Sequence, residues 1–134
     1  MSKKPNPPTN VTILTIFVLS ITSWNIIRAY SAITNWQVLI EYQANPAYIL
    51  ATGVIWALVG LWLFRGILKG YHYTIRASLA AAGLYYIWYW CDRLFVQSSP
   101  APNVNFSAIF STIFLAIFSL LLSIPSTKAF FNKE

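Results

Sequence analysis

Long apolar stretches alternate with short polar segments along the chain. Four stretches contain few charged residues, at about 11–33, 47–67, 75–95 and 106–124. A hydrocarbon layer about 30 Å thick is crossed by a helix of roughly 20 apolar residues. The pattern therefore predicts an all-α polytopic membrane protein with four transmembrane helices.

The segments between the later helices are short, at residues 68–74 and 96–105. Short connections place consecutive helices side by side and antiparallel. We therefore expect one domain over residues 1–134, with helices that run alternately up and down. The first residues, 1–10, contain several prolines and are expected to form an extended tail.

The first connection, residues 34–45, is longer and has a different pattern. Trp36, Leu39 and Ile40 fit one face of a helix, and polar residues lie between them. This pattern predicts a short interfacial segment after the first helix, in the headgroup region, or a continuation of that helix beyond the membrane. An amphipathic helix that binds a partner is the alternative.

The composition agrees with a membrane protein. Hydrophobic residues make up 57% of the chain and charged residues 9%, against about 45–50% and 25% in soluble domains. A soluble protein of this size would need more polar residues to cover its surface. The single cysteine, Cys91, excludes an intrachain disulfide and a metal site made only of cysteines.

The net charge of +6 comes from basic residues that occur singly at helix ends. Without a basic run, no nucleic acid is expected as a partner, and anionic membrane lipids are. Arg28 and Arg93 fall on one side of the predicted bundle. The other basic residues fall on the opposite side: Lys3, Lys4, Arg65, Lys69, Arg76, Lys128 and Lys133. Because basic residues favour the cytoplasmic side, both termini are predicted to be cytoplasmic.

Four ionisable residues should meet near the outer membrane interface: Arg28, Glu41, Asp92 and Arg93. Charges near hydrocarbon are costly unless they are paired or solvated. We expect interfacial pairing, for example of Arg28 with Asp92, or side chains that reach out to water. The alternative is a polar mouth that binds a headgroup, a quinone or a partner protein.

An aromatic block lies near the end of the third predicted helix: Tyr85, Tyr86, Trp88, Tyr89 and Trp90. Trp and Tyr concentrate at membrane interfaces, so the block is expected to anchor the helix there. Two alternatives remain, a flat pocket for a quinone or pigment and a contact surface for another protein.

Small residues recur on the second and third predicted helices. They are Gly53, Ala57 and Gly60 on the second helix, and Ala77, Ala80 and Ala81 on the third. Small residues let helix backbones approach closely in a membrane. We expect these two helices to pack against each other through these faces.

The sequence offers little catalytic or metal chemistry. It has no Ser, His and Asp set, no glycine-rich phosphate loop and no pair of acids in one membrane site. His72, the only histidine, lies in a predicted turn, which suits neither haem nor chlorophyll ligation. No catalytic residue, metal or cofactor is therefore predicted, and the chain is not expected to be an enzyme.

Residues 53–61 (GVIWALVGL) and 85–94 (YYIWYWCDRL) resemble segments of small four-helix bacterial integral membrane proteins of unknown function. The resemblance covers under half of the chain. It implies a bacterial plasma (inner) membrane and no particular activity.

By elimination, the leading hypothesis is a non-catalytic accessory or scaffold subunit of a larger membrane complex, such as a respiratory or photosynthetic one. The fourth predicted helix is apolar nearly all round, which gives it surface for other integral membrane subunits. The alternatives are a small oligomeric transporter or channel, and a binder of a lipid, quinone or pigment. A transporter usually carries a charge in the middle of its helices, and the second and fourth helices have none.

Overall fold

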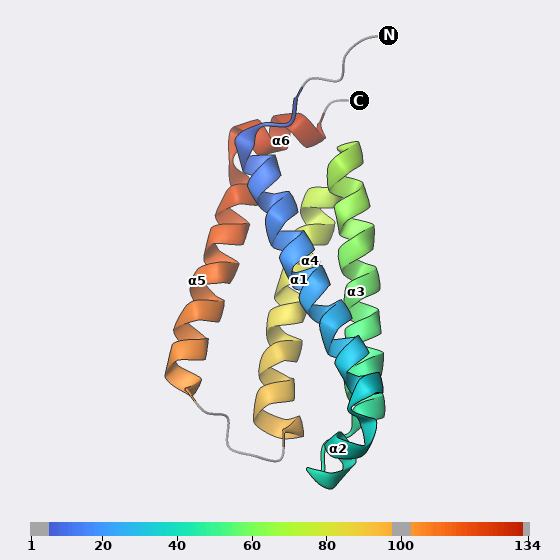
Figure 1. Ribbon diagram of the computed structural model, residues 1–134. Helices are drawn as coiled ribbons and strands as arrows, with labels where there is room; N and C mark the ends of the chain where they lie inside the picture. Colours follow the sequence, from blue (N-terminus) through green and yellow to red (C-terminus); the bar gives the residue numbers. More distant parts are fainter. Residues whose placement is uncertain (1–5, 98–102, 133–134) are drawn as a thin grey trace.

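The computed structural model describes residues 6–97 and 103–132, and every regular element in these ranges is a helix. Successive long helices run in opposite directions, as expected (Figure 1). The elements are α1 (Thr9–Thr34), α2 (Trp36–Glu41), α3 (Pro46–Lys69), α4 (Thr74–Cys91), a π-helical turn η1 (Asp92–Val96), α5 (Val104–Ser123) and α6 (Pro125–Phe131).

Three of the long helices are long and apolar enough to cross a membrane. They are α1, α3 and α5, with mean hydropathies of 1.6, 2.0 and 2.2. The expected fourth, α4, does not reach this level. Its 18 residues include Arg76 and a run of Tyr and Trp, whose polar N–H and O–H groups make it less apolar. By length and composition, the described part of the chain therefore has three candidate spans and not four.

Local signals explain where the helices begin and end. Pro8 has a φ of −61° and precedes α1, so Thr9 and Asn10, expected in the tail, belong to the helix. The side chain of Asn45 accepts a hydrogen bond from the Tyr48 N–H at 3.1 Å and caps α3. Gly70, with a φ of 68°, ends α3 in a left-handed conformation that favours glycine. Residues 1–5, residues 98–102 of the expected connection at 96–105, and residues 133–134 lie outside the described residues.

The short segment expected after the first helix is a separate helix, α2. Asn35 interrupts the chain between α1 and α2, with a φ of −109°. None of the α2 residues is buried. The segment is therefore a distinct surface helix and not a continuation of α1.

The closest helix pair is α1 with α3. A Cβ at Gly53 would lie 3.0 Å from the Ala29 Cβ, and one at Gly60 would collide with the Thr22 hydroxyl. The glycines thus let the two backbones meet, as small residues do in membranes. The predicted partner was wrong, because α3 presents these glycines to α1 and not to α4. Buried Ala57 lies between them in the sequence.

The small residues of α4 are divided between two environments. Ala77 and Ala81 pack against the hydrophobic core, whereas Ala80 is exposed. Ala80 is therefore not part of a packing face among the described residues.

The buried core is concentrated at the end of the bundle that carries α6 (Figure 1). Phe118 and Leu122 attach α5 to this core, and Phe131 attaches α6. At the opposite end of α5, Phe106 is 70% exposed and Phe110 is also exposed. Because α5 is held mainly at its α6 end, its other half diverges from α1 and α4.

Candidate functional site

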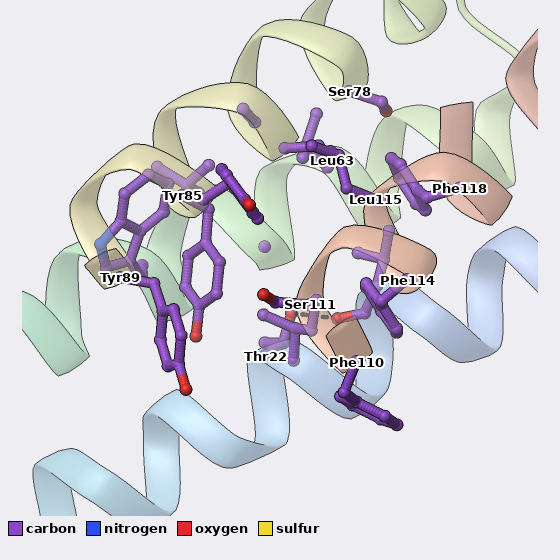
Figure 2. Close-up of a pocket in the computed structure, with 18 of the residues that line it drawn as sticks. Thr22, Leu63, Ser78, Tyr85, Tyr89, Phe110, Ser111, Phe114, Leu115 and Phe118 are labelled. Atoms are coloured by element: carbon purple, nitrogen blue, oxygen red, sulfur yellow. Dashed lines mark hydrogen bonds between the residues drawn. The ribbon is translucent and has the colours of Figure 1, made fainter. Parts of the chain in front are cut away.

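A cleft of about 310 Å³ lies where α5 diverges from the other helices. Its volume is at the lower end of the range for small-molecule sites, roughly 300–1,000 Å³. Figure 2 shows side chains from α1, α4 and α5 directed toward this space. Its lining includes Thr22 of α1, Trp56, Gly60 and Leu63 of α3, Ser78, Ala81, Tyr85, Tyr86 and Tyr89 of α4, and Phe106, Phe110, Ser111, Phe114 and Phe118 of α5.

Large and small residues together shape the cleft. Aromatic rings come from both facing helices, α4 and α5, and Phe17 of α1 packs against Phe114 with ring centroids 4.8 Å apart. Small side chains such as Gly60 and Ala81 leave the space between these rings open. No lining residue is charged. The cleft therefore suits the neutral, apolar part of a ligand, because an unpaired charge would be costly there.

Several hydroxyl groups face this apolar space, and most are already paired. Thr22 Oγ1 donates to the Val18 carbonyl at 2.7 Å, and Ser111 Oγ donates to the Ala108 carbonyl at 3.3 Å. Tyr86 exchanges a hydrogen bond with Thr112 at 3.0 Å. These groups satisfy themselves within the protein, as serine and threonine commonly do in membrane helices.

The hydroxyl groups of Tyr85 and Tyr89 instead accept hydrogen bonds from other side chains. The Tyr85 hydroxyl accepts from Asn25 Nδ2 at 3.3 Å, and the Tyr89 hydroxyl accepts from Arg93 Nη1 at 3.4 Å. In Figure 2 the two phenol side chains extend from α4 in the same general direction. In both bonds the tyrosine oxygen is the acceptor, so its own O–H proton remains available to donate.

Asn25 is a fully buried polar residue on α1. Its side chain is 0% exposed, and Nδ2 also donates to the Ile21 carbonyl at 2.8 Å. Its Oδ1 has no hydrogen-bond partner among the described residues. A polar side chain at membrane depth is expensive and often marks a functional site. Here it positions the Tyr85 hydroxyl.

The structure brings together only some of the four ionisable residues that were expected to meet. Arg28 Nη2 lies 3.4 Å from Asp92 Oδ1, so the expected pair is present. The Arg28 guanidinium also lies over the Trp88 ring, 4.8 Å from its centroid. Asp92 Oδ2 accepts from Gln97 Nε2 at 3.2 Å. These contacts tie α1 to the end of α4.

The other two expected members are placed apart from this pair. Arg93 donates to Tyr89 and so borders the cleft. Glu41 ends α2, is exposed, and pairs with none of the described basic residues. The four residues therefore do not form one polar mouth, because α2 carries Glu41 on an exposed surface.

The aromatic block is divided between the bundle and the cleft. Tyr85 packs edge-on against Trp56 of α3, with centroids 4.8 Å apart, and Trp88 donates to the Tyr48 hydroxyl at 3.1 Å. Tyr86 lies near α5 and packs against Trp90, with centroids 6.5 Å apart. Part of the block therefore joins helices, and its three tyrosines line the cleft.

The described residues contain no group of three or more His, Cys, Asp or Glu side chains that could hold a metal ion. His72 is exposed and contacts the Tyr73 ring edge-on, with centroids 6.3 Å apart.

Comparisons with protein families, with curated proteins and with solved structures find no match to this chain.

Sequence reasoning missed several residues of this region, among them Thr22, Asn25 and Trp56. Asn25 carried a usable signal, because it is an amide in the middle of an apolar stretch. Thr22 and Trp56 carried none, because their role depends on which helices meet.

Proposed function

We propose that the protein spans a bacterial plasma membrane four times, with α4 as the fourth span. The 18 residues of α4 and the five of η1 form one continuous helical segment of 23 residues. This length suffices for a hydrocarbon layer about 30 Å thick. Arg65 and Lys69 lie near the end of α3, Arg76 lies near the start of α4, and Lys128 lies in α6. Figure 1 shows these segments on the same side of the bundle, which supports a cytoplasmic location for that side.

We further propose that the protein is a non-catalytic binder of a neutral, lipid-like molecule. The observation that carries this proposal is the uncharged, aromatic cleft of about 310 Å³ between α1, α3, α4 and α5. Phe106 and Phe110 line the cleft and are also exposed, so in a bilayer this part of its rim would face the hydrocarbon. A molecule dissolved in the membrane could then enter sideways without crossing water.

The experiment compares two alanines that are neighbours in the sequence. Ala81 lines the cleft, whereas Ala80 is exposed. The protein is purified in mild detergent, and bound molecules are extracted and identified by mass spectrometry. We expect a neutral molecule at near-stoichiometric level in the wild type and in Ala80→Leu, and its depletion in Ala81→Leu. Equal retention in both variants, or no retained neutral molecule, would overturn the proposal.

An accessory subunit is the second candidate, favoured by the surface of α5. Ile109, Ile113 and Leu120 are all exposed on this apolar helix, and α5 is anchored mainly at one end. A helix of a larger complex could cover this face. Native gel separation of gently extracted membranes tests the idea. A large band with a fixed set of other proteins supports it, and a band containing this chain alone contradicts it.

The transporter alternative gains no comparable support. Among the described residues, Asp92 is the one acid that adjoins the bundle, and Arg28 already neutralises it. A proton-coupled carrier would instead need an acid that alternates between two solvent-exposed states.

A further inference from the structure

We propose that the ligand of the cleft carries carbonyl oxygens on a flat, neutral ring, as a membrane-soluble quinone does. This inference rests on the proposed binding function and adds the chemical class of the ligand. It is drawn from the two tyrosines, from the depth at which they lie, and from the rings that face them.

The hydrogen-bond directions at Tyr85 and Tyr89 select an acceptor. Each phenol oxygen already accepts a bond, from Asn25 at 3.3 Å and from Arg93 at 3.4 Å. Each O–H proton has no acceptor among the described residues. A phenol with its acceptor role occupied is set up to donate. The complementary ligand group is an oxygen that only accepts, and a carbonyl is such a group.

The third tyrosine of the cleft provides a contrast. Tyr86 also lines the space, but its hydroxyl is engaged with Thr112 at 3.0 Å. The Tyr86 hydroxyl therefore already has a hydrogen-bond partner within the protein. Of the three cleft tyrosines, Tyr85 and Tyr89 keep a hydroxyl proton free to donate, and they are four residues apart on one face of α4.

The depth of Tyr85 argues against an ordinary phospholipid ester. Tyr85 lies 11 residues after Thr74, which begins α4, and 11 residues before Val96, which ends η1. At 1.5 Å per residue this is roughly 16 Å from either end. The ester carbonyls of a phospholipid lie near the headgroups, whereas a neutral ring can enter the middle of the bilayer.

The facing side chains favour a ring over a flexible chain. Phe110 and Phe114 of α5 stand across the cleft from the tyrosines of α4. Aromatic side chains gain from offset or edge-on contact with another ring, a benefit that an alkyl chain does not provide. The remainder of the cleft, toward Leu63 and Phe118, is apolar apart from the Ser78 hydroxyl and would receive the first part of a hydrocarbon tail.

The test uses full-length protein in detergent and three compounds: a benzoquinone with a decyl tail, decylbenzene, and a phosphatidylcholine. Binding is measured by calorimetry. We expect the quinone to bind at least fivefold more tightly than decylbenzene. Tyr85→Phe and Tyr89→Phe should each weaken quinone binding about five- to thirtyfold and leave decylbenzene unchanged. The matched control, Tyr30→Phe, changes an exposed tyrosine of α1 outside the cleft and should stay within twofold of the wild type.

The outcomes separate this inference from the proposed function. Equal binding of quinone and decylbenzene, both lost in Ala81→Leu, would overturn the carbonyl inference and leave a lipid-binding cleft. Phosphatidylcholine that binds as tightly as the quinone, with the same response to Tyr85→Phe, would assign an ester carbonyl and overturn the quinone class. No binding of any compound would contradict the proposed function itself. Circular dichroism of each variant establishes that it is folded.

Discussion

Arg28 and Asp92 are separated by 64 residues in the sequence and form an ion pair with 3.4 Å between Nη2 and Oδ1. Their side chains are only 19% and 9% exposed, so neither charge is fully solvated. The pair joins the last third of α1 to η1, which directly follows α4.

The first prediction concerns this pair. Arg28→Ala and Asp92→Asn should each lower the free energy of unfolding by about 2 kcal/mol, because the partner loses its counter-charge in a poorly solvated site. Arg28 retains some exposure, which keeps the loss below that of a fully buried pair. Unfolding in mixed micelles measures both variants and the double variant.

The double variant supplies the internal control. It should be less destabilised than the sum of the single variants, because both remove the same interaction. An exposed arginine at the other end, Arg76, provides a matched comparison. Strictly additive losses, or an equal loss for Arg76→Ala, would show that the pair contributes nothing specific.

The second prediction tests the contact between α1 and α3. A Cβ at Gly60 would collide with the Thr22 hydroxyl and lie 3.1 Å from the Thr22 Cβ. Thr22 is buried, so relief requires a shift of the helices. Gly60→Ala should therefore destabilise the protein by about 1–3 kcal/mol in the same unfolding assay.

Gly83 is the matched control for this substitution. Nothing lies within 4 Å of a Cβ built at this position, in the middle of α4. Gly83→Ala should be neutral or should stabilise the protein by up to about 1 kcal/mol, because alanine favours helix more than glycine does. If both substitutions had the same effect, close packing at Gly60 would not be the reason for glycine there.

The sequence predicted the helices well and their partners poorly. Helix positions follow from apolar length and from local signals such as Pro46 and Gly70, which act within a few residues. Which helix receives Gly53 and Gly60 depends on complementary residues elsewhere, here Ala29 and Thr22. Small residues indicate close packing but carry no information about the partner.

In the candidate site, too, one feature could be predicted from the sequence and another could not. The pairing of Arg28 with Asp92 was expected, because two opposite charges near one interface have few other ways to be stabilised. A flat pocket at the aromatic block was one alternative, but the position of the cleft was not predicted, because it depends on the divergence of α5. That divergence follows from where α5 is buried, at Phe118 and Leu122, and from nothing in its local sequence.

The third prediction concerns how α6 holds α5 in place. Phe131 is 1% exposed and belongs to the core at the α6 end. Phe131→Ala should cost about 3–4 kcal/mol of unfolding free energy, because it removes a buried ring and leaves a cavity. Phe106→Ala, at an exposed position, should cost little in detergent. A similar small loss for both variants would mean that α6 does not contribute to the core.

The fourth prediction tests whether α4 crosses the membrane, which its composition alone does not establish. In a background with Cys91→Ala, single cysteines replace Glu41, Lys69 or Lys128. A membrane-impermeant maleimide is added to intact spheroplasts, and labelling is repeated after permeabilisation. With four spans, Glu41→Cys should be labelled from outside, whereas the other two should react only after permeabilisation.

The comparison of Lys69→Cys with Lys128→Cys shows whether α4 crosses the membrane. These positions lie before α4 and after α5, so two crossings bring the chain back to the same side of the membrane. If α4 does not cross, α5 alone separates them, and Lys128→Cys must react from outside while Lys69→Cys stays protected. That result would leave three spans, and it would also place the tyrosines of α4 at a membrane surface. The depth argument for a ring-bearing ligand would then fail together with the fourth span.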